Sequence, residues 1–370
     1  FQIVRGDQTN GDKDKYHTAF MAEVEPMGYR VYRLYLEKKS EACFEKELSV
    51  TEHVLENRRI KVEFSRLTGD ICSIYDKLTG KYILNGVCSA VLLDETDCDT
   101  WAHNKKYLGE VVGKFGEPEF SIIEQGPVRA ILRVKTKYHD SILQRDYILE
   151  PGSDAVKVKA VVDFHEKHKT LKIAFPAAED KTVSKIPFGT IVRENGQGEE
   201  PTGSWFTNGR LCIANDSKYG YDTIGEKIRL TVLRSAIYAD HFGVRDKFCE
   251  YMEQGIHEFT YMLYSYTDNA GAERKAEELN FPMRYLLESF HDGPLAERKS
   301  CLTCDTDNII ITAVKQAEDD ENDVVRFYET DGKNTTVSLN IFDKKIVTDI
   351  SHNEIKTLRT DGTEVNLIEW

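Results

Sequence analysis

The sequence predicts an all-β protein whose main body is one large antiparallel sandwich, with smaller β-sandwich segments flanking it. Three observations indicate this class. Apolar and polar residues alternate with a period of two, glycine-containing turns separate the alternating runs, and helical patterns are scarce. Such alternation places one face of a strand on a core and the other face in water, as in antiparallel sheets packed face to face.

The alternating runs can be followed along the chain. The clearest ones occupy residues 29–36, 59–64, 128–134, 155–162, 170–175 and 228–233. Turn sequences lie at residues 67–70, 77–80, 150–153 and 361–362, each with a glycine that permits a reversal of the chain. Residues 270–279 are rich in Ala, Glu and Lys and predict either one short helix or an ordered loop.

The 370 residues predict two or three domains, at about 150 residues per domain. We expect a lead-in β segment over residues 1–47, whose charged stretch 37–47 suits a linker. A large β-sandwich then spans residues 48–290, because a dozen strand candidates are too many for a simple immunoglobulin-like domain. Residues 291–370 read as a small C-terminal β-sandwich.

The charge balance excludes some partners. There are 49 basic and 63 acidic residues, a formal net charge of −14. An acidic surface is repelled by phosphate backbones and lacks a basic membrane-docking face, so we expect neither nucleic acid nor membrane as a partner. The chain begins with Phe1 and not with Met, from which we expect a piece of a longer protein.

The eight cysteines are too dilute for a small disulfide-stapled fold. Cys301 and Cys304 have a spacing found in metal sites, but no second cysteine pair follows them, and the sequence after them at residues 309–312 is typical of a strand. We therefore expect reduced thiols and a cytoplasmic protein.

His165 and His168 are a candidate metal pair that the pattern does not favour. Two zinc-binding histidines on a helix lie four positions apart, whereas these lie three apart. The surrounding sequence is typical of a strand, on which residues three apart point to opposite faces. Sharing one ion becomes possible only if the segment turns. We expect structural histidines and no metal site in this chain.

Two polar, aromatic segments are candidate sugar-binding loops. Residues 97–104 combine Asp99, Trp101 and His103, and an indole face can stack on pyranose C–H groups while polar neighbours bind hydroxyls. The alternative is a loop whose tryptophan plugs the sandwich. Residues 215–222, which end at Asp222, form a similar polar segment, although alone they indicate only a turn.

An ordered series of segments resembles glycoside hydrolase family 38, the α-mannosidases. Residues 161–176 (VVDFHEKHKTLKIAFP) resemble the segment of that family that has the pattern VDWHExHKxLKxAFP. Further similar pieces follow in the expected order at residues 24–30, 64–76, 99–101, 186–189, 215–222, 233–235 and 257–261.

The resemblance covers the C-terminal β portion of such enzymes, and implies a super-β-sandwich of the galactose-mutarotase-like kind. It implies a parent enzyme that hydrolyses terminal α-D-mannosides with retention and with zinc, both in an upstream domain. No His-x-Asp triplet of the kind that binds this zinc occurs in the 370 residues. We therefore expect no catalytic residue and no cofactor in this chain, which by itself is inactive.

The resemblance also implies that loops of the large sandwich approach the substrate. By position it assigns an arginine to Arg234 and an aromatic loop to Trp101 with His103, and a planar guanidinium can bridge vicinal hydroxyls of mannose. We expect a mannose-containing glycan or glycoside and the protein's own N-terminal catalytic domain as partners, with a homo-oligomer left open. The alternatives are a stand-alone carbohydrate-binding module and a sugar-epimerase-like protein.

Overall fold

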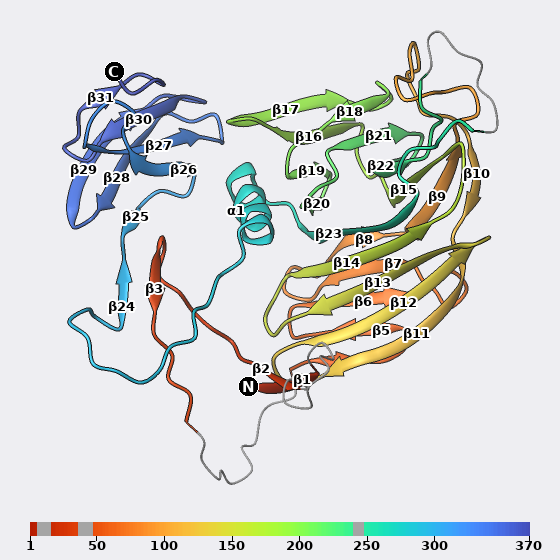
Figure 1. The fold of residues 1–370 in the computed structure, drawn as a ribbon, viewed down its shortest axis with the longest axis horizontal. Helices are drawn as coiled ribbons and strands as arrows, with labels where there is room; N and C mark the ends of the chain where they lie inside the picture. Colours follow the sequence, from red (N-terminus) through yellow and green to blue (C-terminus); the bar gives the residue numbers. More distant parts are fainter. Residues whose placement is uncertain (6–15, 36–46, 240–247) are drawn as a thin grey trace. The chain divides into compact units, whose positions relative to one another are not determined.

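The computed structural model describes residues 1–5, 16–35, 47–239 and 248–370, and they form antiparallel β-sheets (Figure 1). The helix α1 (Asn269–Asn280) is the only one in these ranges. The prediction of an all-β, antiparallel fold is confirmed. The linker predicted at residues 37–47 lies, except for Glu47, outside the described residues.

The chain divides into two compact units. Unit 1 contains residues 1–20, 44–185 and 191–266, and unit 2 contains residues 21–43, 186–190 and 267–370.

Unit 1 has two layers (Figure 1). One layer is a nine-stranded sheet in the order β11 (Gly116–Gln125), β12 (Ala130–Tyr138), β13 (Ser141–Leu149), β14 (Ala155–Phe164), β23 (Gly255–Ser265), β20 (Leu211–Asn215), β19 (Trp205–Asn208), β16 (Lys181–Ile186), β17 (Gly189–Glu194).

Two sheets form the other layer. The five-stranded sheet has the order β4 (Ser49–Val50), β5 (Val54–Glu56), β6 (Ile60–Phe64), β7 (Ile71–Asp76), β8 (Lys81–Asn85). The six-stranded sheet has the order β10 (Val111–Lys114), β9 (Ser89–Asp94), β15 (Lys169–Pro176), β22 (Lys227–Arg234), β21 (Gly220–Ile224), β18 (Glu199–Pro201). A hairpin of β1 (Gln2–Arg5) and β2 (Tyr16–Ala19) belongs to the same unit.

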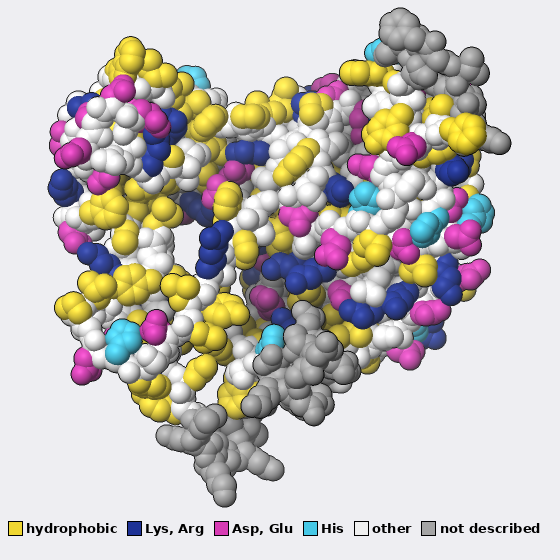
Figure 2. Space-filling view, in the orientation of Figure 1, with side chains coloured by type: hydrophobic (Ala, Val, Ile, Leu, Met, Phe, Trp, Pro, Cys, Tyr) yellow, Lys and Arg dark blue, Asp and Glu magenta, His cyan; other side chains and the backbone are white. Residues whose placement is uncertain are grey.

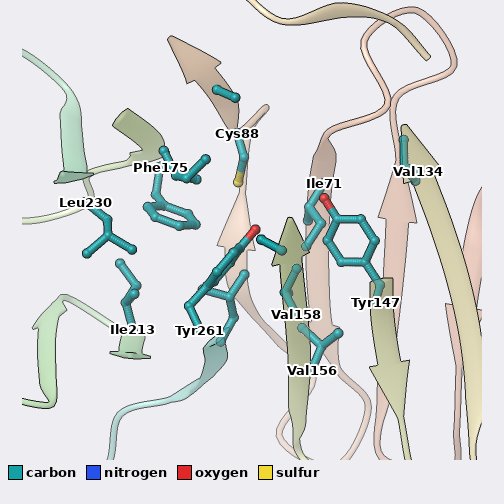
Figure 3. Close-up of a cluster of buried hydrophobic side chains, with 14 of the residues drawn as sticks. Ile71, Cys88, Val134, Tyr147, Val156, Val158, Phe175, Ile213, Leu230 and Tyr261 are labelled. Atoms are coloured by element: carbon teal, nitrogen blue, oxygen red, sulfur yellow. The ribbon is translucent and has the colours of Figure 1, made fainter. Parts of the chain in front are cut away.

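The core of unit 1 is one continuous cluster that joins all three large sheets. Figure 3 shows Ile71 from the five-stranded sheet, Phe175 and Leu230 from the six-stranded sheet, and Val158 and Tyr261 from the nine-stranded sheet. The alternation noted in the sequence explains this packing, since strand β14 buries every second side chain. Burial raises the pKa of Tyr261 in this cluster.

Two of the four predicted turns join neighbouring strands of the five-stranded sheet. Gly69 lies between β6 and β7 with φ 73°, and Gly80 lies between β7 and β8 with φ 67°. A side chain at Gly69 would meet Pro118 and Val134, so this turn requires glycine both for its backbone conformation and for space.

Unit 2 contains a small sandwich and α1. Its three-stranded sheet has the order β25 (Leu302–Cys304), β28 (Thr335–Ile341), β29 (Lys344–Ile350), and its four-stranded sheet has the order β26 (Ile309–Gln316), β27 (Asp323–Glu329), β30 (Ile355–Arg359), β31 (Glu364–Val365). Side chains of both sheets, such as Leu339 and Phe327, share one core. A further pair, β3 (Gly28–Arg30) with β24 (Arg298–Ser300), lies in this unit.

The short helix predicted near residues 270–279 is present as α1. Asp268 caps its N-terminus, where the carboxylate accepts a hydrogen bond from Gly271 N at 2.7 Å. Within the described residues, no helix is long and apolar enough to cross a bilayer.

The surface mixes both signs of charge. Figure 2 shows Lys and Arg interspersed with Asp and Glu over the outer face of the strands β11 to β14. Pairs such as Arg133 with Asp146, 2.6 Å apart on neighbouring strands β12 and β13, account for this pattern.

Candidate functional site

The outward face of the six-stranded sheet carries the candidate site. Strand alternation turns Leu92 and Ile173 toward the main core, and turns Leu93 and Lys172 to the opposite face. That outward face is covered by residues 95–110, here called the covering loop, which connect β9 to β10.

The covering loop is packed down on the sheet. Ala102 and Leu108 form a small apolar cluster with Val91, Leu93 and Ala174 of strands β9 and β15. At the far side of the sheet, Lys106 O accepts a hydrogen bond from Glu199 N at 2.9 Å, beside β18. The loop therefore spans the sheet from β9 to β18 before it returns to β10.

Arg234, at the end of β22, anchors the first half of the covering loop. Its Nε and Nη2 lie 2.8 and 2.7 Å from Glu95 Oε1, and Glu95 is fully buried. The same guanidinium contacts Thr100 O from Nη1 and Asp99 O from Nη2, both at 3.3 Å. One planar cation thus joins a buried carboxylate to two loop carbonyls through its fixed, forked set of donors.

The anchored loop presents Trp101 and His103 to solvent. Trp101 is 60% exposed, and its ring lies 6.0 Å from the His103 ring with 17° between the planes. Trp101 N donates to Asp99 Oδ1 at 2.9 Å, and the left-handed conformations of Ala102 and Asn104 turn the chain beyond it. The alternative of a tryptophan that plugs the sandwich does not fit this exposure.

The backbone of the loop is also bound to the segment after β22. Asp99 forms a β-bridge with Ile237, and Thr100 N donates to Ile237 O at 3.1 Å. Thr100 Oγ1 accepts a hydrogen bond from Ala239 N at 3.0 Å. Asp99, Trp101, His103 and Arg234, four of the five residues predicted to bind sugar, therefore belong to one local assembly.

Asp222, the fifth, lies on strand β21 at the same sheet face but is fully buried. Its carboxylate accepts two hydrogen bonds from Arg229, both at 2.6 Å, and one from Lys172 Nζ at 2.9 Å. Lys172 also contacts Glu199 and donates to Thr231 Oγ1 at 2.8 Å. In this arrangement the Asp222 oxygens are already engaged by protein cations beneath the covering loop.

His165 and His168 lie in the connection from β14 to β15, where the chain passes from the nine-stranded to the six-stranded sheet. His165 Nε2 lies 2.9 Å from Asp163, whereas His168 Nε2 lies 3.0 Å from the Tyr251 hydroxyl. The two imidazoles therefore bind different partners. Among the described residues, no group of three or more His, Cys, Asp or Glu side chains could hold a metal ion.

Sequence reasoning missed Glu95 and Thr170 at the base of the loop, and did not place His168 beside them. Glu95, His168 and Thr170 adjoin one another there, and Glu95 Oε2, His168 Nδ1 and Thr170 Oγ1 are buried without a hydrogen-bond partner in the described part of the chain. The sequence did contain a signal for polar groups beneath the covering loop, because Lys172 interrupts an otherwise apolar run in strand β15. Glu95 had no comparable signal.

Comparison with known proteins places this arrangement in a family. Residues 55–242, about half of the chain, match the family described as "Glycosyl hydrolases family 38 C-terminal domain". The chain belongs to glycosyl hydrolase family 38. Residues 308–369 match the "Glycosyl hydrolases family 38 C-terminal beta sandwich domain". The first match includes the covering loop, Arg234 and all six strands of the sheet below.

Two curated relatives of this family-38 chain are α-mannosidases. Alpha-mannosidase 2C1 of Homo sapiens is 28% identical over 222 residues, which cover 55% of this chain and 20% of that protein. Alpha-mannosidase of Saccharomyces cerevisiae is 24% identical over 342 residues, which cover 78% of this chain and 30% of that protein. The chain therefore spans between a fifth and a third of the length of these relatives.

A solved structure agrees with the fold. A family-38 protein from Enterococcus faecalis superposes with a TM-score of 0.73 at 17% identity, covering 87% of this chain and 46% of that one. The family-38 chain described here thus has the fold of the C-terminal β-sandwich region of that family.

Proposed function

We propose that this chain is the C-terminal, non-catalytic part of an α-mannosidase, and that its covering loop forms part of the rim of the active site. The parent enzyme would hydrolyse terminal α-D-mannosides with retention, using zinc held in a domain outside this chain. The family membership and the two relatives named α-mannosidases support the reaction.

The observation that carries the rim proposal is the anchored, exposed Trp101. An indole face can lie against the C–H groups of a pyranose, and a neighbouring imidazole can bind a hydroxyl. Arg234 serves this site by fixing Asp99 and Thr100, so that the tryptophan is presented in one position and little ordering is needed when sugar binds.

The zinc of the proposed reaction is assigned no ligand here. The described residues offer no group of three side chains suited to a metal ion. In this proposal the rest of the parent enzyme supplies the zinc ligands, and this chain contributes sugar binding and scaffolding.

The first experiment replaces Trp101 by Ala in the parent enzyme and measures hydrolysis of an aryl α-mannoside. Losing one sugar-stacking ring should raise KM about 5- to 30-fold, with a smaller effect on kcat. Trp370→Ala is the matched control, because Trp370 is 72% exposed but lies in unit 2. An unchanged KM for Trp101→Ala would remove the covering loop from the rim.

A second experiment tests the division of labour. The parent chain should hydrolyse the aryl α-mannoside, and the 370-residue chain alone should not. Turnover by the 370-residue chain at enzyme-like rates would overturn the proposal that the catalytic residues lie elsewhere.

A further inference from the structure

Unit 2 contains a long segment in which every residue is exposed. Residues 281–297 follow α1 without forming helix or strand, and β24 then begins at Arg298. An exposed connection of this kind is ordinarily polar. This one instead exposes seven large apolar side chains: Phe281, Met283, Tyr285, Leu286, Leu287, Phe290 and Leu295.

A second apolar segment of unit 2 runs beside the first. Strand β3 pairs with β24, Val31 N donates to Glu297 O at 2.7 Å, and the rings of Tyr35 and Phe290 lie 5.6 Å apart. Exposed apolar side chains of this second segment are Met21, Val24, Met27, Val31, Tyr32, Leu34 and Tyr35. We call residues 21–35 together with 281–297 the apolar arm. Figure 2 shows hydrophobic side chains gathered around β3 and β24, which Figure 1 locates.

Hydrogen bonds and ion pairs join the two segments of the apolar arm at one end. Arg30 makes two hydrogen bonds to Glu25, at 2.7 and 3.2 Å, and Arg33 pairs with Glu297. Tyr29 donates its hydroxyl proton to Ala296 O at 3.0 Å. Together with the ring contact of Tyr35 and Phe290, these contacts keep the two apolar segments beside each other, so that one partner could cover both.

Apolar side chains left in water forgo about 25 cal/mol for each Å² that could be buried, and soluble monomers seldom expose large contiguous apolar patches. Charged side chains of both signs, such as Arg284 and Asp292, are scattered along the arm. Its surface therefore favours a partner that binds through apolar contact, as in permanent interfaces, over one recognised by charge.

We propose that the apolar arm is the docking surface for the portion of the parent α-mannosidase that lies outside this chain. The proposal rests on the proposed function. Its further support is length: the matched region is 46% of the Enterococcus faecalis family-38 chain, so more than half of that protein lies outside it. An attached portion of that size is large enough to cover the arm and to bury its apolar side chains.

The experiment places one cysteine on the apolar arm and one elsewhere in the parent chain, and compares their rates of alkylation by mass spectrometry. Leu286→Cys probes the arm, where Leu286 is 97% exposed. Leu67→Cys is the matched control, because Leu67 is 86% exposed in the β6–β7 turn of unit 1. The native Cys212, fully buried, should stay unmodified and reports that the variants are folded.

If the arm is covered, the cysteine at 286 should react at least about tenfold more slowly than the one at 67, because modification then requires the interface to open. Equal rates would overturn the proposal. Protection of position 286 that disappears on dilution, together with dissociation of a dimer, would also overturn it, because a second copy would then be the occupant. The measurement does not depend on turnover, so a parent chain without α-mannosidase activity would refute the proposed function and leave this result interpretable.

Discussion

The fully buried carboxylate of Glu95 lies 2.7 Å from Nη2 of Arg234, whose guanidinium also contacts two carbonyls of the covering loop. One cation from strand β22 therefore holds both the buried carboxylate at the start of the covering loop and the backbone of its exposed part. Arg234 is only about one-fifth exposed, so water could not fully compensate for the negative charge if the Glu95 carboxylate were removed.

Glu95→Gln should weaken this anchor. The amide keeps the size of the side chain but leaves the guanidinium without its countercharge, so the free energy of unfolding should fall by about 2 kcal/mol. Hydrogen exchange over residues 95–104 should accelerate, including at Thr100, whose N–H is bound to Ile237 O. Both quantities can be measured by denaturant titration and by hydrogen-exchange mass spectrometry.

The matched control for Glu95 is its neighbour Asp94. Asp94 pairs with Lys169 at 3.0 Å, but its side chain is 40% exposed. Asp94→Asn should therefore cost less than about 1 kcal/mol. Equal effects of the two substitutions would contradict the anchoring role of Glu95.

Gly109→Ala should disturb the other end of the covering loop. Gly109 has φ 122°, and a Cβ there would clash with the carbonyl oxygen of Asp94. The substitution adds steric conflict to backbone strain, and we expect a loss of about 2–3 kcal/mol in a thermal or urea unfolding experiment.

Gly225→Ala separates the two causes. Gly225 also has a positive φ, of 53°, but nothing lies near its added Cβ. Its substitution should cost only about 1 kcal/mol, the strain of the backbone conformation alone. If Gly109→Ala proves no worse than Gly225→Ala, the close approach of the loop to Asp94 is not needed for stability.

Local pattern was sufficient to predict the fold class and to single out the loop that contains Trp101, whereas Arg234 was named only through the resemblance to family 38. The alternation in residues 155–162 and 170–175 is local, and it predicted strands β14 and β15 correctly. Trp101 was conspicuous because an indole flanked by carboxylates, an imidazole and an amide is typical of sugar-binding surfaces. By contrast, residues 31–36 alternate like a strand, yet β3 ends at Arg30. The strand partner β24, more than 250 residues away, pairs with only three residues there.

The residues beneath the covering loop could not be predicted to meet, because their contacts depend on which strands become neighbours in the sheet. Glu95 and Arg234 are 139 residues apart and meet only because β9 and β22 both flank β15. Asp222 looked like a turn residue, and its burial follows from its register opposite Arg229. Pairing across a sheet is set by the whole core and not by the local sequence.

The core of unit 1 contains an ion pair that should be costly to break. Arg145 Nη1 donates to Asp70 Oδ1 at 2.7 Å, and both side chains are almost fully buried. Asp70→Asn leaves a buried cation without its countercharge, which should lower the free energy of unfolding by about 3–5 kcal/mol.

Replacing both members of this pair should be better tolerated. In Asp70→Leu with Arg145→Met, no unpaired charge stays in the core, and the loss should be smaller than for Asp70→Asn alone by about 2 kcal/mol or more. Guanidinium chloride unfolding of the three proteins tests the comparison. A double variant as unstable as the single one would show that the pair does more than neutralise charge.

Unit 2 should lose stability in acid because of Glu329, at the end of β27. Burial alone would raise the pKa of this carboxyl, but hydrogen bonds from Asn353 N at 2.9 Å, Asn308 Nδ2 at 2.8 Å and Asp331 N at 2.8 Å outweigh it and lower the pKa below its ordinary value of 4.5. A carboxyl whose pKa is lower in the folded state contributes stability above pH 4.5 and loses it as the pH falls through the folded pKa.

Glu329→Gln should remove this dependence. The amide group turns an N–H donor toward backbone N–H donors, so at neutral pH the variant should be less stable by about 2 kcal/mol. In acid, below the lowered pKa of Glu329, the difference should shrink, because the native carboxyl is then protonated. Glu364→Gln is the control, since that side chain is 59% exposed beside Lys356 and should change little at either pH. Urea unfolding at neutral and at acidic pH measures how far the free energy of unfolding of each variant differs from that of the native protein. A difference for Glu329→Gln that stays constant or widens in acid would contradict the assignment of the lowered pKa to this carboxyl.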